Sequence, residues 1–208
     1  MSNPRTRVVV LGSTGSIGVN TLDVIARHSE RYEAFALTAS TNVDGMAAQC
    51  AKFCPAFAVM ANADAGKALQ ELCVANSLPT RVLWGAEALV SVAAHEQADA
   101  VMAAIVGAAG LAPCMAAAKA GKRLLLANKE ALVVGGHLFM DAVQSGGATL
   151  LPIDSEHSAI FQSLPQDRTS WKTSVDKIIL TASGGPFRTW TPEKMRVVTP
   201  DQACAHPN

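Results

Sequence analysis

Short apolar runs alternate with longer stretches of helical periodicity along most of this chain. The short runs predict strands, and the longer stretches predict helices. Several predicted strands, such as Arg7–Leu11 and Arg123–Ala127, are almost continuously apolar, which is typical of strands covered by helices on both faces. The alternation indicates βαβ units, so we expect an α/β fold with a mainly parallel sheet. The predicted strands are 7–11, 34–39, 57–60, 81–84, 100–105, 123–127 and 149–153, and the predicted helices are 17–28, 43–53, 63–76, 87–96, 111–120 and 132–145.

The pattern changes after Thr149–Ile153, where the chain becomes richer in proline. Prolines occur at 152, 165, 186, 192 and 200, and two of the three tryptophans also lie in this part. We therefore expect a domain boundary near residue 150, with 1–150 forming the parallel-sheet domain and 151–208 the beginning of a second domain. The chain ends on His-Pro-Asn without a closing strand or helix, which we interpret as a truncation.

The composition indicates a large buried core and argues against several classes of partner. Half of the residues are hydrophobic and 16% are charged, so disorder is not expected. The 17 basic and 17 acidic residues cancel, and no basic run exceeds Lys122-Arg123, which argues against nucleic-acid binding. The sequence starts without a signal segment and its apolar stretch at 98–113 is too short to span a bilayer, so we expect a cytoplasmic protein with no membrane partner.

The five cysteines, at 50, 54, 73, 114 and 204, contain no CxxC pair. An odd number without that spacing argues against a disulfide framework or a zinc site. We expect these cysteines to be small core residues in a reducing compartment.

The first predicted strand runs into a glycine-rich turn at 12–18, with the sequence Gly-Ser-Thr-Gly-Ser-Ile-Gly. A helix that starts near Ser16 leaves its first N–H groups unpaired, and these donors and the helix dipole attract a pyrophosphate. We expect Gly12 to permit the tight turn, Gly15 to let phosphates approach, and Gly18 to let the helix pack closely. Three hydroxyls add donors, those of Ser13, Thr14 and Ser16. The GxxGxxG spacing is weak alone, but after the first strand of a βαβ unit it predicts a Rossmann-like dinucleotide-binding domain.

The end of the second predicted strand favours NADP over NAD. NAD-selective domains usually place an acidic residue there, on the ribose 2′-hydroxyl. Here the strand ends in Ser40-Thr41-Asn42, so a 2′-phosphate would meet neutral donors, and we expect Ser40 and Asn42 to contact it. The nearby Asp44, and the lack of a lysine or arginine at this tip, keep NAD open as the alternative.

Two charged clusters follow later strands, at the sheet edge where open α/β proteins place their chemistry. Asn128-Lys129-Glu130 follows one strand, and by itself this Lys–Glu pair is more often a solvated surface pair. Asp154-Ser155-Glu156 follows the next strand, and its two carboxylates could converge on Mg²⁺ or Mn²⁺, although Asp-x-Glu is common by chance. An octahedral ion would need a further protein ligand, and we interpret His157 as a packing or helix-start residue and not as that ligand.

A third feature, Thr181–Phe187, reads as a strand ending in Ser-Gly-Gly. Its hydroxyl and exposed amides could bind an anion. A plain tight turn explains the same residues equally well.

Taken together, these segments resemble the 1-deoxy-D-xylulose 5-phosphate reductoisomerase family, whose members use NADPH and a divalent metal in non-mevalonate isoprenoid biosynthesis. The resemblance runs in order along essentially the whole chain. The motifs that carry it are Leu-Gly-Ser-Thr-Gly-Ser-Ile-Gly (11–18), Ala-Ala-Ile-Val-Gly-Ala-Ala-Gly-Leu (103–111), Leu-Leu-Ala-Asn-Lys-Glu (125–130), Leu-Pro-Ile-Asp-Ser-Glu-His-Ser-Ala-Ile-Phe-Gln (151–162), Ser-Gly-Gly-Pro-Phe-Arg (183–188) and Pro-Asp-Gln-Ala-Cys-Ala-His-Pro-Asn (200–208).

The resemblance implies roles for particular residues. Cofactor contacts fall on Thr14, Gly15, Ser16, Ile17, Asn42, Asn128 and Glu130. Substrate contacts fall on Lys129, Ser155, Glu156, Ser183 and His206, and metal ligands on Asp154 and Glu156. Lys129 and Glu156 are the implied catalytic residues, and the implied ion is Mg²⁺ or Mn²⁺, with Co²⁺ as a further candidate.

The resemblance also implies an oxidoreductase that isomerises and then reduces a small phosphorylated sugar, and that forms a homodimer. The chain departs from the family at the tip of the second strand, where Ser40-Thr41 replaces the usual Gly-Lys and a lysine contact to the 2′-phosphate is lost. Family members are about twice as long, so 151–208 would be only the first part of an α+β catalytic domain. We therefore expect the isolated chain to bind NADPH and to be catalytically inactive, because a third metal carboxylate and a substrate lid are missing.

Two other functions fit parts of the sequence. A non-catalytic nucleotide-sensing domain would need the glycine turn but would have no use for Lys129 or the Asp154–Glu156 pair. A dehydrogenase of the aspartate-semialdehyde type would need a reactive cysteine on a strand-to-helix turn. Cys114 lies at a predicted helix start beside Pro113, with no paired histidine evident, which disfavours that interpretation.

Overall fold

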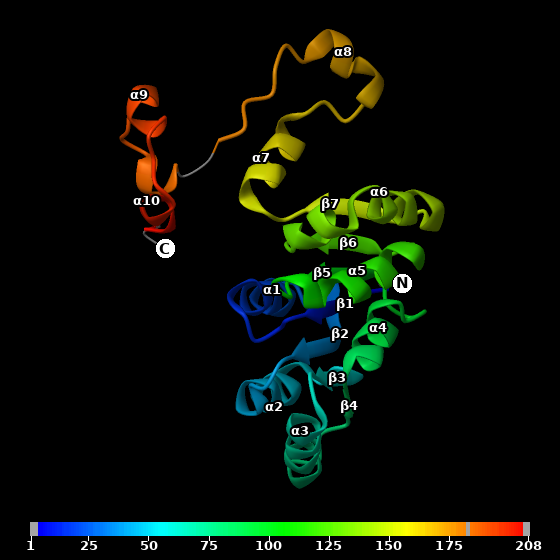
Figure 1. The fold of residues 1–208 in the computed structure, drawn as a ribbon. Coiled ribbons are helices and arrows are strands. Elements are labelled where there is room, and N and C mark those ends of the chain that lie inside the picture. Colours follow the sequence, from blue (N-terminus) through cyan, green and yellow to red (C-terminus); the bar gives the residue numbers. More distant parts are fainter. Residues whose placement is uncertain (1–3, 182–183, 206–208) are drawn as a thin grey trace. The chain divides into compact units, whose positions relative to one another are not determined.

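The computed structural model describes residues 4–181 and 184–205, and its centre is a seven-stranded sheet (Figure 1). The strand order is β4-β3-β2-β1-β5-β6-β7, and every neighbouring pair is parallel. The strands are β1 (Thr6–Leu11), β2 (Tyr32–Ala39), β3 (Phe57–Met60), β4 (Arg81–Trp84), β5 (Ala100–Ala103), β6 (Arg123–Leu126) and β7 (Thr149–Pro152). The predicted α/β fold with a parallel, Rossmann-like sheet is confirmed.

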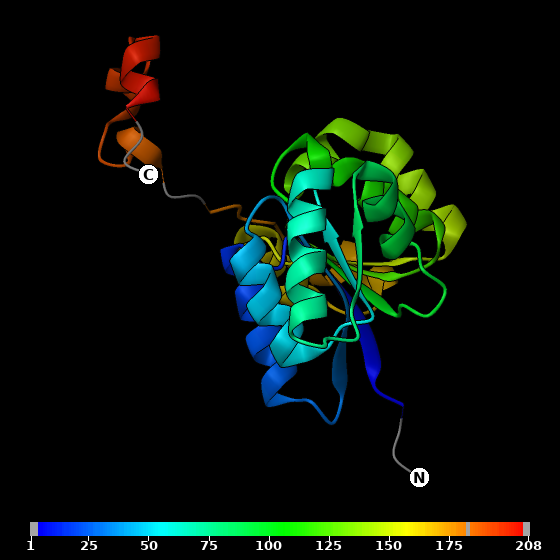
Figure 2. The ribbon, with the colours of Figure 1, turned by 90° about the horizontal axis from the view of Figure 1, so that it is seen from below.

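Helices cover the sheet on both faces (Figure 1 and Figure 2). They are α1 (Ser16–Arg27), α2 (Val43–Phe53), α3 (Ala63–Ala75), α4 (Ala86–Ala93), α5 (Leu111–Lys119) and α6 (Lys129–Gly146). Alternate residues of β1 enter different cores, because successive side chains of a strand point to opposite faces. Val8 and Val10 pack in the core under α1 to α3, and Val9 and Leu11 pack in the core under α4 to α6.

The helix predicted over 87–96 ends at Ala93, and the predicted boundaries also differ at β5 and α6. We predicted a strand to residue 105, but β5 ends at Ala103. One further bond, from the amide of Ala104 to the carbonyl of Leu11, continues the ladder before the chain turns away. The helix predicted to begin at Leu132 begins at Lys129, because the side chain of Asn128 caps it.

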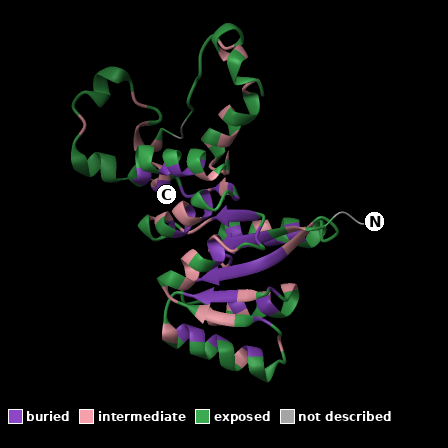
Figure 3. Ribbon diagram, turned by 90° about the vertical axis from the view of Figure 1, so that its right-hand side faces the viewer, coloured by how far each residue is buried: buried purple, intermediate pink, exposed green. Residues whose placement is uncertain are grey.

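The chain divides into two compact units, one up to Asp154 and one from Ser155 onward. The second unit contains α7 (Ser155–Ser163), α8 (Trp171–Ser174), α9 (Pro192–Met195) and α10 (Pro200–Cys204), with short 3₁₀ turns at Arg168–Ser170 and Gly185–Phe187. Figure 3 shows the contrast in burial: the sheet is largely buried, whereas the described residues after 154 are exposed or half-buried.

The strand predicted to lead into Ser-Gly-Gly is absent over the described residues 175–181. That stretch runs without ladder pairing, and the apolar Ile178, Ile179 and Leu180 are each more than half exposed. The prediction was wrong because a strand needs a neighbouring strand to pair with, and residues 155–181 contain no other strand. Gly184 takes the left-handed conformation at φ +78°, which starts the 3₁₀ turn after it.

Three of the five cysteines are core residues, as predicted. Cys50, Cys73 and Cys114 are buried, and burial raises the pKa of the Cys50 and Cys114 thiols to about 12. Cys54 and Cys204 are exposed, so the prediction was wrong for these two. Across the described ranges, no helix combines the length and the hydrophobicity that crossing a membrane requires.

Candidate nucleotide and substrate site

The glycine turn lies where the winding of the sheet changes direction. β1 and β5 are neighbours, and the chain builds outward from them to β4 on one side and to β7 on the other. In open α/β sheets, ligands bind beyond the carboxyl ends of the strands at this position. The turn at 12–18 follows β1, the loop 104–107 follows β5, and Asn128 follows β6, so all three lie on that edge.

Two glycines of the turn are required by close backbone contacts. Gly12 has φ +82°, and a Cβ there would lie 2.9 Å from the carbonyl oxygen of Ala104. A Cβ on Gly18 would lie 2.3 Å from the carbonyl oxygen of Gly12, so helix α1 can pack against the turn only without a side chain. Gly15 is the exposed N-cap of α1, and a Cβ there would have the carbonyl oxygen of Gly12 as its nearest neighbour, at 3.5 Å.

The first turn of α1 presents backbone donors to the sheet edge. The N–H groups of the first helical residues have no partner within a helix. Ser16 and Ile17 are exposed, and Thr14 is half-buried. This is the arrangement that binds a phosphate group, since the positive end of the helix dipole lies at the same place.

Ser13 does not belong to this donor set, which corrects our expectation. Its side chain is fully buried, and its hydroxyl lies 2.6 Å from Oε1 of Gln49 and 3.2 Å from the carbonyl oxygen of Thr38. The Nε2 of Gln49 donates back to the Ser13 carbonyl at 2.9 Å. Thr38 Oγ1 accepts from the amide of Gly12 at 2.9 Å. The hydroxyl therefore fastens the turn to β2 and α2, and no local pattern in the sequence points to Gln49 as its partner.

The tip of β2 is open to solvent. Ser40, Thr41 and Asn42 are all exposed, as is Asp44 in the first turn of α2. Oδ1 of Asn42 accepts from the amide of Gly45 at 2.9 Å, so this residue also caps α2. We had not assigned that cap, although an Asn directly before a helical pattern is a recognisable signal for it.

Lys129 of the first predicted charged cluster lies beside Asp154 of the second. Nζ of Lys129 lies 3.0 Å from Oδ2 of Asp154, which ends the first unit after β7. The lysine side chain is 59% exposed and the aspartate side chain 15%. Glu130, in the first turn of α6, is half-buried. An amine and a carboxylate are thus held side by side at the carboxyl edge of β6 and β7.

Asn128, between β6 and α6, is 3% exposed. Its Oδ1 accepts from the amide of Ala131 at 3.0 Å, which caps the helix. Its Nδ2 donates to the carbonyl oxygens of Ile105 and Gly107, at 2.5 and 3.0 Å. The side chain that we expected to contact the cofactor therefore binds the loop after β5.

The remaining predicted residues lie in the second unit or outside the described part. Ser155 and Glu156 open α7, and Oγ of Ser155 donates to Oε2 of Glu156 at 2.9 Å. Ser183 and His206 lie outside the described residues. Within the described ranges, no group of three or more His, Cys, Asp or Glu side chains could hold a metal ion, so Asp154 and Glu156 would need ligands from elsewhere.

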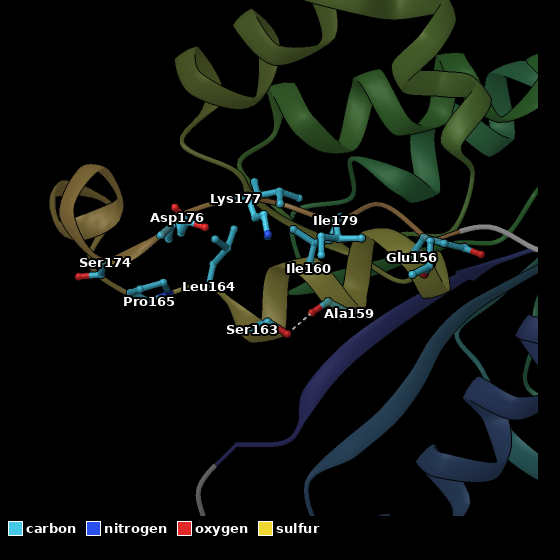
Figure 4. A pocket seen from close by; sticks show the side chains of 13 residues that line it. Glu156, Ala159, Ile160, Ser163, Leu164, Pro165, Ser174, Asp176, Lys177 and Ile179 are labelled. Carbon is cyan, nitrogen blue, oxygen red and sulfur yellow. Dashed lines mark hydrogen bonds between the residues drawn. The ribbon is translucent and has the colours of Figure 1, made fainter.

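Glu156 lies at one end of a pocket of about 580 Å³ between α7 and the extended segment that follows α8 (Figure 4). Ile160 of α7 and Leu164, which directly follows that helix, line it from one side, and Lys177 and Ile179 line it from the other. The lining is mostly apolar, and its charged residues are Glu156, Asp176 and Lys177.

Comparison with known proteins decides the family. A sequence profile described as 1-deoxy-D-xylulose 5-phosphate reductoisomerase matches residues 8–136, and a profile of the C-terminal domain of that enzyme matches 150–208. The chain belongs to the 1-deoxy-D-xylulose 5-phosphate reductoisomerase family.

Curated reductoisomerases are similar over nearly the whole chain. The enzyme of Ralstonia nicotianae is 61% identical over 202 residues, which are 97% of this chain and 51% of that protein. The enzyme of Aromatoleum aromaticum is 59% identical, with the same coverage of 97% and 51%. The chain therefore spans about half the length of the curated relatives it matches.

Solved reductoisomerase structures share the fold. One, in complex with NADPH, fosmidomycin and magnesium, is 42% identical, has a TM-score of 0.84, and is matched over 98% of this chain and 51% of that one. The enzyme from Zymomonas mobilis in complex with NADPH is 46% identical, also with a TM-score of 0.84, over 96% of this chain and 51% of that one. The family motif at 103–111 contains the loop that Asn128 binds, and we had assigned that motif no role.

Proposed function

We propose that this chain provides the NADPH-binding domain, 1–150, and the first part of the catalytic domain, 151–208, of a 1-deoxy-D-xylulose 5-phosphate reductoisomerase. The observation that carries the proposal is the joint placement of the glycine turn and the Lys129–Asp154 pair on one sheet edge. The family assignment supports the same activity. The product of the proposed reaction is 2-C-methyl-D-erythritol 4-phosphate.

The cofactor part of the proposal depends on two surfaces of the first unit. Gly12, Thr14, Gly15, Ser16 and Ile17 form the turn that would receive the pyrophosphate. The lack of a Cβ at Gly15 fits a close approach by the phosphates. Solved relatives with bound NADPH support the choice of dinucleotide.

The 2′-phosphate of NADPH would lie at the tip of β2. Ser40 and Asn42 are exposed there and neutral, so no carboxylate at the strand end repels the phosphate. On the other side of β1, Glu130 completes the proposed set of direct contacts, and Asn128 contributes to the cofactor site through the loop that its side chain binds. NADPH supplies the hydride when it is bound.

The proposed substrate is a small phosphorylated sugar, held by Lys129, Ser155, Glu156, Ser183 and His206. Carboxylate oxygens suit Mg²⁺, Mn²⁺ or Co²⁺, so Asp154 and Glu156 fit the role of metal ligands. A divalent ion held there would supply Lewis-acid polarisation of a carbonyl. The ammonium group of Lys129, already ordered by Asp154, would stabilise negative charge that develops on a substrate oxygen.

The chemistry assigned to these residues has two stages. A C–C bond of the substrate is broken and remade to give a branched aldehyde phosphate, and the aldehyde is then reduced. Lys129 and Glu156 would orient the reacting oxygens through both stages. We place the intact enzyme in the cytoplasm as a homodimer, as family resemblance implies.

Calorimetric titration with NADPH and NADH tests the cofactor assignment on this chain. We expect binding of NADPH that is tighter than binding of NADH, because the tip of β2 accommodates the 2′-phosphate. Binding of NADH with no heat from NADPH would overturn the assignment. We also expect no substrate-dependent oxidation of NADPH by these 208 residues alone, since the metal site lacks a further ligand among the described residues.

A further inference from the structure

The side chain of Asn128 joins three segments of the sheet edge. It caps α6 through the amide of Ala131, and it binds the carbonyl oxygens of Ile105 and Gly107 in the loop after β5. Its own backbone amide donates to the carbonyl of Ala103 at 3.2 Å. We propose that Asn128 is a positioning residue, which fixes the loop 105–107 and thereby shapes the nicotinamide half of the cofactor site. This inference rests on the proposed function.

The hydrogen-bonding groups of this amide argue against direct contact with a ligand. An asparagine side chain has two N–H donors and one carbonyl oxygen. Both donors of Asn128 are used by Ile105 and Gly107, and Ala131 takes one of the two acceptor positions of the oxygen. The side chain is also 3% exposed. It can therefore influence a bound nucleotide only through the segments that it holds.

The surroundings of Asn128 are built for this contact. A Cβ on Gly110 would lie 2.2 Å from Nδ2 of Asn128, so the residue at 110 must lack a side chain. Gly107 has φ +76°, a conformation that other residues rarely adopt. Both glycines lie in the family motif at 103–111. Between the two carbonyls that Asn128 binds lies Val106, which is 83% exposed.

The loop held by Asn128 lies directly against the glycine turn. The backbone of Ala104 and Ile105 would be within 3.3 Å of a Cβ on Gly12, and the amide of Ala104 donates to Leu11. A dinucleotide centred on the turn at β1 places its adenosine half over β2 and its other half over β5 and β6. The loop 105–107 is on the second side, so loosening it should affect only the nicotinamide half.

The test is a comparison of two ligands and two variants of this chain. Asn128→Asp keeps the helix cap, because Asp is as good an N-cap residue as Asn. It also replaces both donors by a carboxylate oxygen facing two carbonyls. Asn62→Asp is the matched control, since Asn62 caps α3 in the same way, through the amide of Ala65, and follows β3 instead of β6. The ligands are NADPH and adenosine 2′,5′-bisphosphate, which occupies the β2 side alone.

We expect Asn128→Asp to weaken NADPH binding about tenfold, the equivalent of one lost buried hydrogen bond. Binding of the bisphosphate should stay within about twofold of the unchanged chain, as expected for a site that the change does not reach. Asn62→Asp should change neither affinity. Hydrogen exchange at residues 104–108, measured without nucleotide, should be faster in Asn128→Asp and unchanged in Asn62→Asp.

Each alternative outcome has a distinct meaning. If the unchanged chain binds neither ligand, the proposed function fails, whereas the exchange measurement still reports on the loop. If NADPH binds the unchanged chain and Asn128→Asp equally well, the positioning role is overturned and the proposed function stands. An equal loss for both ligands also overturns it, because that indicates a general loss of structure. Should Asn128→Asp fail to fold, Asn128→Ser, which retains a cap and cannot reach the loop, replaces it with the same expected result.

Discussion

Nζ of Lys129 lies 3.0 Å from Oδ2 of Asp154, although 25 positions separate the two residues in the chain. They meet because β6 and β7 are adjacent parallel strands, with Leu126 paired to Pro152 at their carboxyl ends. A proposed substrate residue and a proposed metal ligand are thereby held in one geometry by the sheet. The pair orders the amine before any ligand is present.

Replacing Lys129 should separate stability from activity. Because the lysine is 59% exposed, Lys129→Met should change the free energy of unfolding by less than about 1 kcal/mol, measured with urea. In a longer chain that contains these residues and turns over substrate, we expect kcat to fall about a hundredfold or more, as when a charge-stabilising group is removed. Arg27→Met, which breaks the exposed pair with Asp23, is the control and should leave kcat unchanged. Equal kcat values for both variants would exclude Lys129 from the chemistry.

A negative charge at the tip of β2 should weaken the preference for NADPH over NADH. Asn42→Asp retains the cap on α2, so the unfolding transition should stay in place. The new carboxylate would face the 2′-phosphate, and we expect NADPH binding to weaken by about tenfold or more while NADH binding does not. Asn62→Asp, the equivalent change at the cap of α3, should alter neither affinity. A parallel loss for both nucleotides would show that the 2′-phosphate lies elsewhere.

Adding an acid to the first turn of α1 should stabilise the fold and weaken binding together. Ser16→Asp places a carboxylate at the positive end of the helix dipole, which should raise the unfolding free energy by about 0.3–1 kcal/mol. The same charge would repel a pyrophosphate, so NADPH and NADH should both bind less tightly in calorimetry. Unchanged affinity for both would place the phosphates away from the glycine turn.

Gln49 should contribute to stability through the turn. In Gln49→Leu, the hydroxyl and carbonyl of the buried Ser13 lose their hydrogen bonds with α2. The free energy of unfolding, measured with urea, should therefore fall by about 1–3 kcal/mol. Gln70→Leu is the matched control, because Gln70 is an exposed residue of α3. A change in stability no larger than that of the control would mean that the turn holds its shape without Gln49.

The exposed and the buried cysteines should differ in their reactivity toward an alkylating reagent. At pH 8, iodoacetamide should label Cys54 and Cys204 in the folded chain, while Cys50, Cys73 and Cys114 react only after unfolding. Mass spectrometry of peptides checks this.

The buried thiol of Cys114 should make stability depend on pH. Burial raises the pKa of Cys114 from its ordinary 9.0 to about 12. Between these values the unfolded thiol ionises and the folded one does not, so stability should fall as the pH rises above 9. In Cys114→Ala, the free energy of unfolding should fall less steeply with pH above 9. An unchanged pH dependence of the unfolding free energy would contradict this prediction.

Much of the fold follows from local patterns. Val8 to Leu11 are uniformly apolar, which predicts a strand covered by helices on both faces. The structure buries all four residues in this way. Repeated βα alternation requires parallel pairing. The helix boundaries were less accurate because caps decide them, and the cap at Asn128 moved the start of α6 to Lys129 from the predicted Leu132.

The candidate site likewise has features that the local sequence predicts and features that only the tertiary structure reveals. Gly12 could be recognised from the sequence because its conformation is a local property, imposed by the turn between β1 and α1. The contacts of Ser13 with Gln49, of Asn128 with Gly107 and of Lys129 with Asp154 could not, because each joins segments at least 21 positions apart. Which strands become neighbours decides which loops meet, and that order arises from packing of the whole sheet. A motif therefore indicates that a residue belongs to the site, whereas the tertiary structure decides whether its side chain faces the ligand or holds another part of the site in place.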